Sequence, residues 1–178
     1  MKIRHLLPLI AVCFLAAAAF GQGQNPAVAA KKTEMAKLEK WAGQWKGSGW
    51  IQMGPTRETF TGGETVQRKL DGLAMLVEGN FVNTEGKPIH QTLAVLTYND
   101  RSASYDFATF LANGITGVQT LKVVGDHYEW GFDIPGGYGS ARYNITITDT
   151  TWSEYGEFSR DGGKTWIKNF EMKLDRSK

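Results

Sequence analysis

The distribution of apolar and polar residues changes at Trp45, after which the two kinds alternate along short segments. Alternation with a period of two predicts half-buried β-strands, and turn signals such as Asp71-Gly72 and Gly125-Asp126 separate the segments. Short turns of this kind join neighbouring antiparallel strands. The pattern therefore predicts about ten strands, at residues 45–53, 58–70, 73–82, 88–98, 104–111, 115–124, 127–134, 140–148, 151–159 and 165–174.

One face of the predicted sheet is apolar, because Tyr128, Trp130 and Phe132 alternate with Glu129 and Asp133. An open sheet of sequentially paired strands would leave two exposed edges, and closure into a barrel removes both of them. We therefore predict an all-β domain, an antiparallel up-and-down barrel, in preference to a two-sheet sandwich. A barrel of about ten strands is wide enough to hold one small molecule.

Helical periodicity occurs only before the first strand. Thr33 can cap a helix, apolar residues recur at helical spacing after it, and Gly43 can end it. We predict one short N-terminal helix at residues 33–42, which begins a single domain at 33–178. The polar segment 22–32 is predicted to be a flexible leader.

Residues 1–21 have the pattern of a secretory signal peptide, in which Lys2 and Arg4 precede one apolar run. Small residues predict cleavage before Gln22, and a later cut near Ala29 is the alternative. The protein is therefore expected to be exported, to the periplasm or to the extracellular space.

The single cysteine, Cys13, lies inside the predicted signal, and Val12 before it does not fit a lipoprotein signal. No later segment is long and apolar enough for a membrane-spanning helix, so we expect a soluble protein without a stable membrane anchor.

Removal of Lys2 and Arg4 reduces the 20 basic residues to 18, which equals the 18 acidic residues. This neutral balance argues against nucleic acid as a partner.

A glycine-rich motif joins the predicted helix to the first strand. Gly43 ends the helix, Trp45 is expected to cap the floor of the barrel, and Gly47 and Gly49 permit sharp strand bending. A helix followed by Gly-x-Trp and a ten-strand meander resembles the lipocalin and fatty-acid-binding-protein superfamily. The resemblance implies a lipocalin-like barrel.

The fuller motif Gly-x-Trp-x-Gly-x-Gly is similar to the opening of nitrobindin-like haem barrels. That resemblance implies a haem whose iron is bound by a histidine in the closing strands. Residues 151–178 contain no histidine, and Tyr155 and Met172 are the alternative ligands there. We therefore predict that the protein binds no haem in this manner, and we expect no other cofactor.

Nearly all of the chain after the signal resembles an uncharacterised family of bacterial exported proteins with a domain of unknown function. The family shares the glycine-rich opening, a Leu-Asp-Gly turn, a strand that ends in a Tyr-Asn/Asp turn, and a basic residue at the end of the last strand. The corresponding motifs here are Leu70-Asp71-Gly72, Tyr98-Asn99-Asp100 and Arg176. The resemblance implies a fold without implying an activity.

Residues 159–166 fit Ser-x-Asp-x-Gly-x-Thr-Trp, which resembles the Asp-box of sialidase-type propellers. A propeller needs several repeats of roughly forty residues, whereas this sequence has one copy of the box. We interpret it as a hydrogen-bonded hairpin turn rather than a glycan site.

Enzyme signatures are sparse. No Gly-x-Ser-x-Gly elbow occurs, and the pair of His127 and Glu129 is too small for a metal site. His127 and His90 each follow a turn, so both are expected at an exposed rim. Four acidic residues on strands could face a cavity, namely Glu78, Asp106, Asp133 and Glu154.

The leading functional hypothesis is binding of a small, largely apolar molecule, supported by the barrel and by an aromatic content of 12%. The candidate ligand-binding residues are Trp130, Tyr143 and Trp152, with Arg142 as a polar anchor. Alternation alone leaves open which face points inward. Two alternatives remain, an enzyme that uses a carboxylate or His127 in the cavity, and a filled barrel that acts through its surface.

Overall fold

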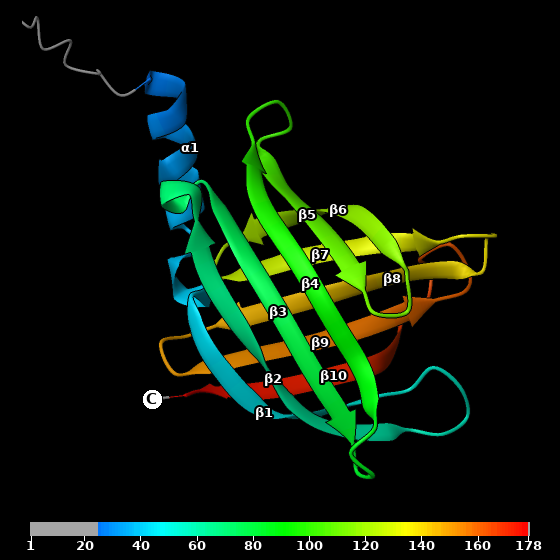
Figure 1. Ribbon diagram of the computed structural model, residues 1–178. Helices are drawn as coiled ribbons and strands as arrows, with labels where there is room; N and C mark the ends of the chain where they lie inside the picture. Colours follow the sequence, from blue (N-terminus) through cyan, green and yellow to red (C-terminus); the bar gives the residue numbers. More distant parts are fainter. Residues whose placement is uncertain (1–24, 178) are drawn as a thin grey trace, which may run out of the picture.

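The computed structural model describes residues 25–177, which form one helix and a closed antiparallel barrel of ten strands (Figure 1). The strands follow one another around the barrel in chain order, and β1 pairs with β10 to close it. The elements are α1 Pro26–Ala36, β1 Gly43–Ile51, β2 Glu58–Lys69, β3 Ala74–Asn83, β4 Pro88–Asn99, β5 Ser104–Leu111, β6 Thr116–Val124, β7 His127–Ile134, β8 Gly139–Ile147, β9 Thr151–Ser159 and β10 Ile167–Arg176. The predicted barrel is confirmed, and every predicted strand is present.

The predicted helix at 33–42 is wrong in its position. Helix α1 begins at Pro26, because the side chain of Asn25 accepts a hydrogen bond from the backbone N–H of Ala27 and Pro26 fits the first helical turn. The helix ends at Ala36, and a separate 3₁₀ turn spans Glu39–Trp41. Part of the predicted flexible leader is therefore helical, while the predicted signal at 1–21 lies outside the described residues.

The chain after α1 closes one end of the barrel with an aromatic cluster that we call the aromatic floor: Trp41, Trp45, Tyr128 and Trp152. The rings meet edge to face, with Trp41 at 4.9 Å from Trp152 and 5.1 Å from Tyr128 between ring centroids. The Tyr128 hydroxyl also donates to the backbone oxygen of Lys37. These contacts attach the helical segment to the barrel and fill its interior at this end.

The glycine-rich motif has the structural role that the sequence predicts for it. Trp45 is 1% exposed, and its indole N–H donates to the backbone oxygen of Trp41 at 2.8 Å. A Cβ atom on Gly47 would collide with the backbone oxygen of Lys173 in β10, and one on Gly49 would meet the Phe60 ring. Glycine at these positions lets strands β10 and β1 approach closely where the barrel bends.

Arg176 at the end of β10 completes the closed end. Its guanidinium lies 4.0 Å from the ring centroid of Trp45 and donates to the backbone oxygens of Lys40, Ala42 and Asp149. The basic residue of the C-terminal motif therefore ties the last strand to the 3₁₀ turn and to the β8–β9 connection.

The Asp-box is a self-contained turn between β9 and β10. Asp161 accepts hydrogen bonds from the Ser159 hydroxyl and from both the backbone and side chain of Thr165, and Trp166 donates to the Gly163 oxygen. The hairpin interpretation is confirmed.

Within residues 25–177, no helix has the length and apolarity to cross a membrane.

Candidate functional site

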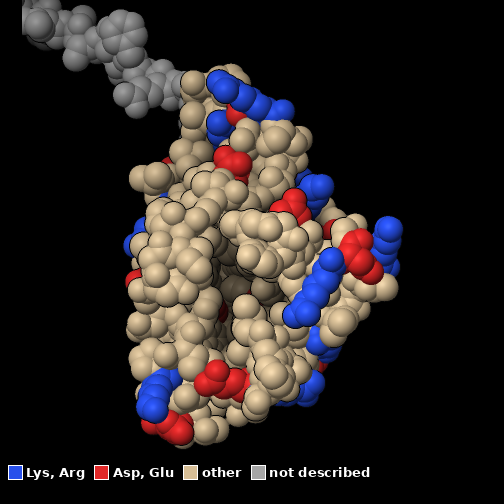
Figure 2. Space-filling model, turned by 90° about the vertical axis from the view of Figure 1, so that its right-hand side faces the viewer, with Lys and Arg blue, Asp and Glu red and all other residues tan. Residues whose placement is uncertain are grey.

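The end of the barrel opposite α1 is hollow (Figure 2). Five connections surround this mouth: β1–β2, β3–β4, β5–β6, β7–β8 and β9–β10. Inward side chains in this half stay partly accessible, among them Thr92, Thr109, Gln119 and Tyr143, while those of the aromatic floor are fully covered. The candidate site is therefore the open half of the barrel interior.

An aromatic wall lies along β7 and β8 inside this half. Trp130 and Tyr143 are paired across the two strands and stack with 4.2 Å between ring centroids and an 11° angle between the planes. Gly156 of β9 makes room for this arrangement, because a Cβ atom there would lie 2.6 Å from the Tyr143 ring. The Phe107 ring packs edge-on against Trp130 at 5.1 Å. The wall gives this part of the interior a large aromatic surface.

Glu64 of β2 is the most buried acidic side chain of the site. It is 9% exposed, and its Oε2 atom has no hydrogen-bond partner among the described residues. Gly79 on β3 leaves the space that the carboxyl occupies, since a Cβ atom there would lie 2.7 Å from Oε1. Burial, and secondly the charge of Glu154, raise the pKa of Glu64 to about 8. The group is therefore a neutral acid at neutral pH.

Glu154 of β9 is a second inward carboxyl, and it is only half-buried. Burial raises its pKa to about 7, and indole N–H groups of Trp152 and Trp130 partly offset this increase. Trp152 donates to Oε2 at 3.3 Å, whereas Nε1 of Trp130 is buried without a hydrogen bond of normal geometry. The interior thus holds two coupled acids beside an unsatisfied indole donor.

His90 lies at the mouth, on the inward side of β4 opposite Phe81. Its Nε2 is 2.6 Å from the hydroxyl oxygen of Thr92. The residue keeps contact with solvent, yet partial burial lowers the pKa of His90. Beside it, Asn83 donates to Glu58 at 3.2 Å.

His127 lies at the closed end, where it contacts Glu129 and Asp126. Hydrogen bonds to these two carboxylates raise its pKa. Its neighbour Tyr128 points into the aromatic floor, so His127 points away from the interior. An enzyme mechanism through His127 in the cavity is therefore wrong.

The closing strands do not fit the haem site that the nitrobindin resemblance implies. Their inward positions in the open half carry Glu154, Gly156, Phe170 and Met172, and none of these supplies an imidazole. Within residues 25–177 no three His, Cys, Asp or Glu side chains are grouped as a metal would require.

The structure brings three of the four predicted ligand-binding residues, Trp130, Arg142 and Tyr143, to the same part of β7 and β8, and Trp130 and Tyr143 point into the barrel. Trp152 belongs to the aromatic floor and reaches the site only through its bond to Glu154. Arg142 does not point into the barrel: it lies on the outer face, donates to Glu157 at 2.7 Å and covers the Trp166 ring. Its neighbours on β8 face inward, and alternation therefore turns Arg142 outward.

Of the four acids considered on strands, only Glu154 faces the interior. Glu78 is exposed, Asp106 accepts from Asn99, and Asp133 accepts from Ser140, all on the outer face. Sequence reasoning missed Glu64. The signal was its place in phase with buried Phe60 and Val66 on the same strand.

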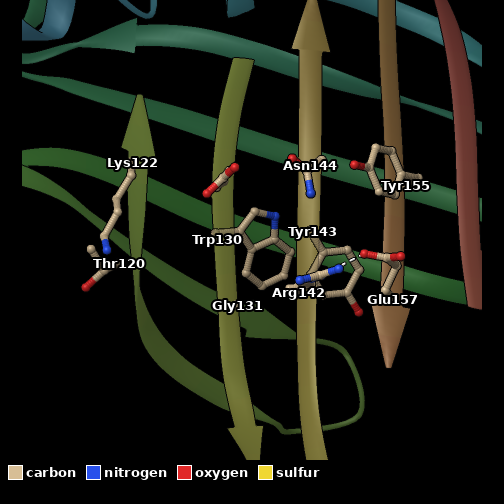
Figure 3. A pocket seen from close by; sticks show the side chains of 10 residues that line it. Thr120, Lys122, Trp130, Gly131, Arg142, Tyr143, Asn144, Tyr155 and Glu157 are labelled. Atoms are coloured by element: carbon tan, nitrogen blue, oxygen red, sulfur yellow. Dashed lines mark hydrogen bonds and ion pairs between the residues drawn. The ribbon is translucent and has the colours of Figure 1, made fainter. Parts of the chain in front are cut away.

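A separate hollow of about 550 Å³ lies over β6 to β9, lined mostly by outward side chains (Figure 3). Lys122, Glu129, Asn144 and the Arg142–Glu157 ion pair border it. Its charges are mixed, and Arg142, Glu157 and Glu129 are already paired with protein groups. It therefore selects no ligand class as clearly as the barrel interior does.

Comparisons with known proteins identify a similar fold and no family. No protein family model matches the chain, and no curated protein matches it. Its structure is similar to the crystal structure of Rv2717c from M. tuberculosis, with a TM-score of 0.60 and 17% sequence identity. The match covers 81% of this chain and 97% of that chain. At this identity the likeness shows a shared barrel fold alone.

Proposed function

We propose that the protein binds a small, largely apolar molecule in the open half of its barrel. The observation that carries this proposal is a buried polar atom without a described hydrogen-bond partner, Oε2 of Glu64, in an interior that also holds the aromatic wall. Buried polar groups in folded proteins are nearly always satisfied, and exceptions call for an explanation. A ligand that supplies the missing hydrogen bonds is such an explanation.

The choice of side chains in the open half also supports a binding cavity over a filled barrel. Inward positions around Glu64 carry Gly47, Gly62 and Gly79, which add no side chain to the interior. The closed half is filled by Trp41, Trp45 and Trp152, whereas the open half combines these glycines with buried phenylalanines such as Phe60 and Phe81. A barrel built only for stability would fill both halves in the same way.

The relation to lipocalin-like barrels and to the uncharacterised exported family belongs to the same proposal. It rests on the helix, the Gly-x-Trp opening and the C-terminal Arg176. Export to the periplasm or the extracellular space is likewise proposed from the signal pattern at 1–21. N-terminal sequencing of the secreted protein should give a chain that begins near Gln22. A chain in the membrane fraction that is acylated or still begins at Met1 would contradict it.

One observation favours a second candidate, an enzyme that uses Glu154. A carboxyl with a pKa of about 7 inside a cavity is suited to general acid–base chemistry near neutral pH. The described residues provide no nucleophile beside it with a base in hydrogen-bond reach. Binding therefore remains the leading proposal.

The binding proposal is tested with the protein purified from its own source and with a neutral probe, 2-naphthalenemethanol. Native mass spectrometry should reveal a retained small molecule that is lost on denaturation, and the probe should bind to delipidated protein by calorimetry. A matched pair of variants locates the site. Thr109 faces inward and is half-buried, whereas Thr120 is exposed on the outer face.

Thr109→Trp should fill the cavity and abolish uptake of the probe, while Thr120→Trp should leave it unchanged. Circular dichroism checks that both variants keep the barrel. Equal binding by both variants, or no binding by the wild-type protein, would refute the proposal.

A further inference from the structure

The open half of the barrel interior is acidic. Its inward positions in β1 to β10 include Glu58, Glu64 and Glu154, and no lysine or arginine occupies any of them. The nearest basic side chains serve elsewhere: Arg176 closes the other end, and Arg142 lies outside. The hollow in Figure 2 likewise shows no basic atoms in view. A ligand that enters this half meets negative charge or neutral acid without a compensating protein cation.

Glu64 is the most important of these acids because it is buried in the barrel wall and its Oε2 atom has no described hydrogen-bond partner. The side chain is 9% exposed, lies in phase with Phe60 and Val66, and keeps Oε2 free of any described donor. Taking an unpaired carboxylate out of water costs far more than burying an apolar group. A buried carboxyl that lacks a protein donor is complementary to a ligand donor, most of all to a charged one.

The aromatic wall points to the same ligand charge. The stacked rings of Trp130 and Tyr143 lie in the same interior as Glu154, and a cation is attracted to an aromatic ring, most strongly to tryptophan. When the site excludes water, this attraction is on the order of 2 kcal/mol. Carboxylates and aromatic faces together are the chemistry that recognises organic ammonium groups.

We propose that the ligand is an organic cation, with an apolar or aromatic body packed against Trp130 and Tyr143 and a protonated amine held by the carboxylates of Glu64 and Glu154. This inference rests on the proposed binding function and specifies its ligand class. An organic anion would find no basic partner in the described interior. A neutral ligand could form hydrogen bonds with the two carboxyl groups but would gain nothing from the charge of their ionised forms.

Proton linkage gives the proposal a signature. Both acids are largely protonated at acidic pH, whereas an ammonium group favours their ionised forms. Binding of the cation should therefore release protons and tighten as pH rises from about 6 to about 8. Of the other inward titratable groups, Tyr143 has its pKa raised to about 12 and stays neutral. Glu58 and His90 lie at the mouth, and burial lowers the pKa of His90, which favours its neutral form.

The test uses three probes that share one aromatic body: 2-naphthylmethylamine, 2-naphthalenemethanol and 2-naphthoate. Calorimetry of the wild-type chain at about pH 8 should show the amine binding about tenfold or more tightly than the alcohol, and the naphthoate binding most weakly. The preference for the amine over the alcohol should be smaller at about pH 6. Repeating the calorimetry in buffers of different ionisation enthalpy should show that binding of the amine releases protons.

Glu64→Gln and Glu154→Gln should each remove most of the preference for the amine and keep binding of the alcohol. Glu78→Gln, at an exposed outward position of the neighbouring strand, is the matched control and should behave as wild type. Equal affinities for amine and alcohol, or tightest binding of the naphthoate, would overturn the cation proposal and leave the binding proposal standing. Failure of all three probes to bind would overturn both.

Discussion

Glu64→Gln should change the pH dependence of stability in the absence of any ligand. The glutamate is 9% exposed, and its Oε2 has no described partner. Burial is the main reason that its pKa rises from the ordinary 4.5 to about 8. Glutamine has nearly the same shape and cannot ionise, so the substitution removes the titration and leaves the packing almost intact.

The sign of the effect follows from proton linkage. The folded state holds the Glu64 proton more tightly than the unfolded state does, so the neutral group supports the fold fully below about pH 4.5. This contribution is lost as the pH rises through about 8, where the buried group must ionise. At about 1.36 kcal/mol per pH unit, the window from 4.5 to about 8 corresponds to an upper bound of roughly 5 kcal/mol in the free energy of unfolding.

Urea unfolding followed by tryptophan fluorescence, at constant ionic strength between about pH 5 and pH 9, measures this difference. Wild type and Glu64→Gln should have similar stability at the acidic end, and the variant should be more stable by several kcal/mol at the alkaline end, with about 5 as the limit. Glu154 titrates in both proteins, so their difference isolates Glu64. The exposed control Glu78→Gln should follow wild type. If the free energies of unfolding of wild type and Glu64→Gln depended on pH in the same way, the raised pKa of Glu64 would be contradicted.

Three further predictions concern the fold. Trp152→Ala should cost about 3–5 kcal/mol in urea unfolding because it opens the aromatic floor, whereas Tyr155→Ala, at an outward position 41% exposed, should cost far less. Gly47→Ala should abolish the cooperative strand signal in circular dichroism, since its Cβ would collide with the backbone of β10, while Gly54→Ala meets no atom within 4 Å and should be tolerated. Asp161→Ala should make amide exchange in the β9–β10 turn about tenfold faster. In wild type this protection should persist at acidic pH and fail only as pH falls toward about 2, because hydrogen bonds to the turn lower the pKa of Asp161 to about 2.

The sequence alone determined the strands, because their alternation and turns are local properties. Turn residues such as Asp71-Gly72 fix where the chain reverses, and sequential reversal of about ten strands leaves closure as the way to remove free edges. The helix was misplaced for a local reason too. Its start depends on the Asn25 cap and on Pro26, whereas apolar spacing alone predicts a start at Thr33. Only packing against the barrel decides which apolar residues of this segment are buried.

Alternation along the strands predicts that Trp130 and Tyr143 lie on one face of the sheet and that Arg142 lies on the other. It does not predict which of the two faces is inside the barrel. Tertiary structure decided that question, because closure of the sheet and the position of the aromatic floor define the interior. It also brought Glu64 of β2 into electrostatic contact with Glu154 of β9, ninety positions along the chain. Burial raises the pKa values of both acids, and the charge of Glu154 raises that of Glu64 further; these causes exist only when β1 and β10 pair to close the barrel.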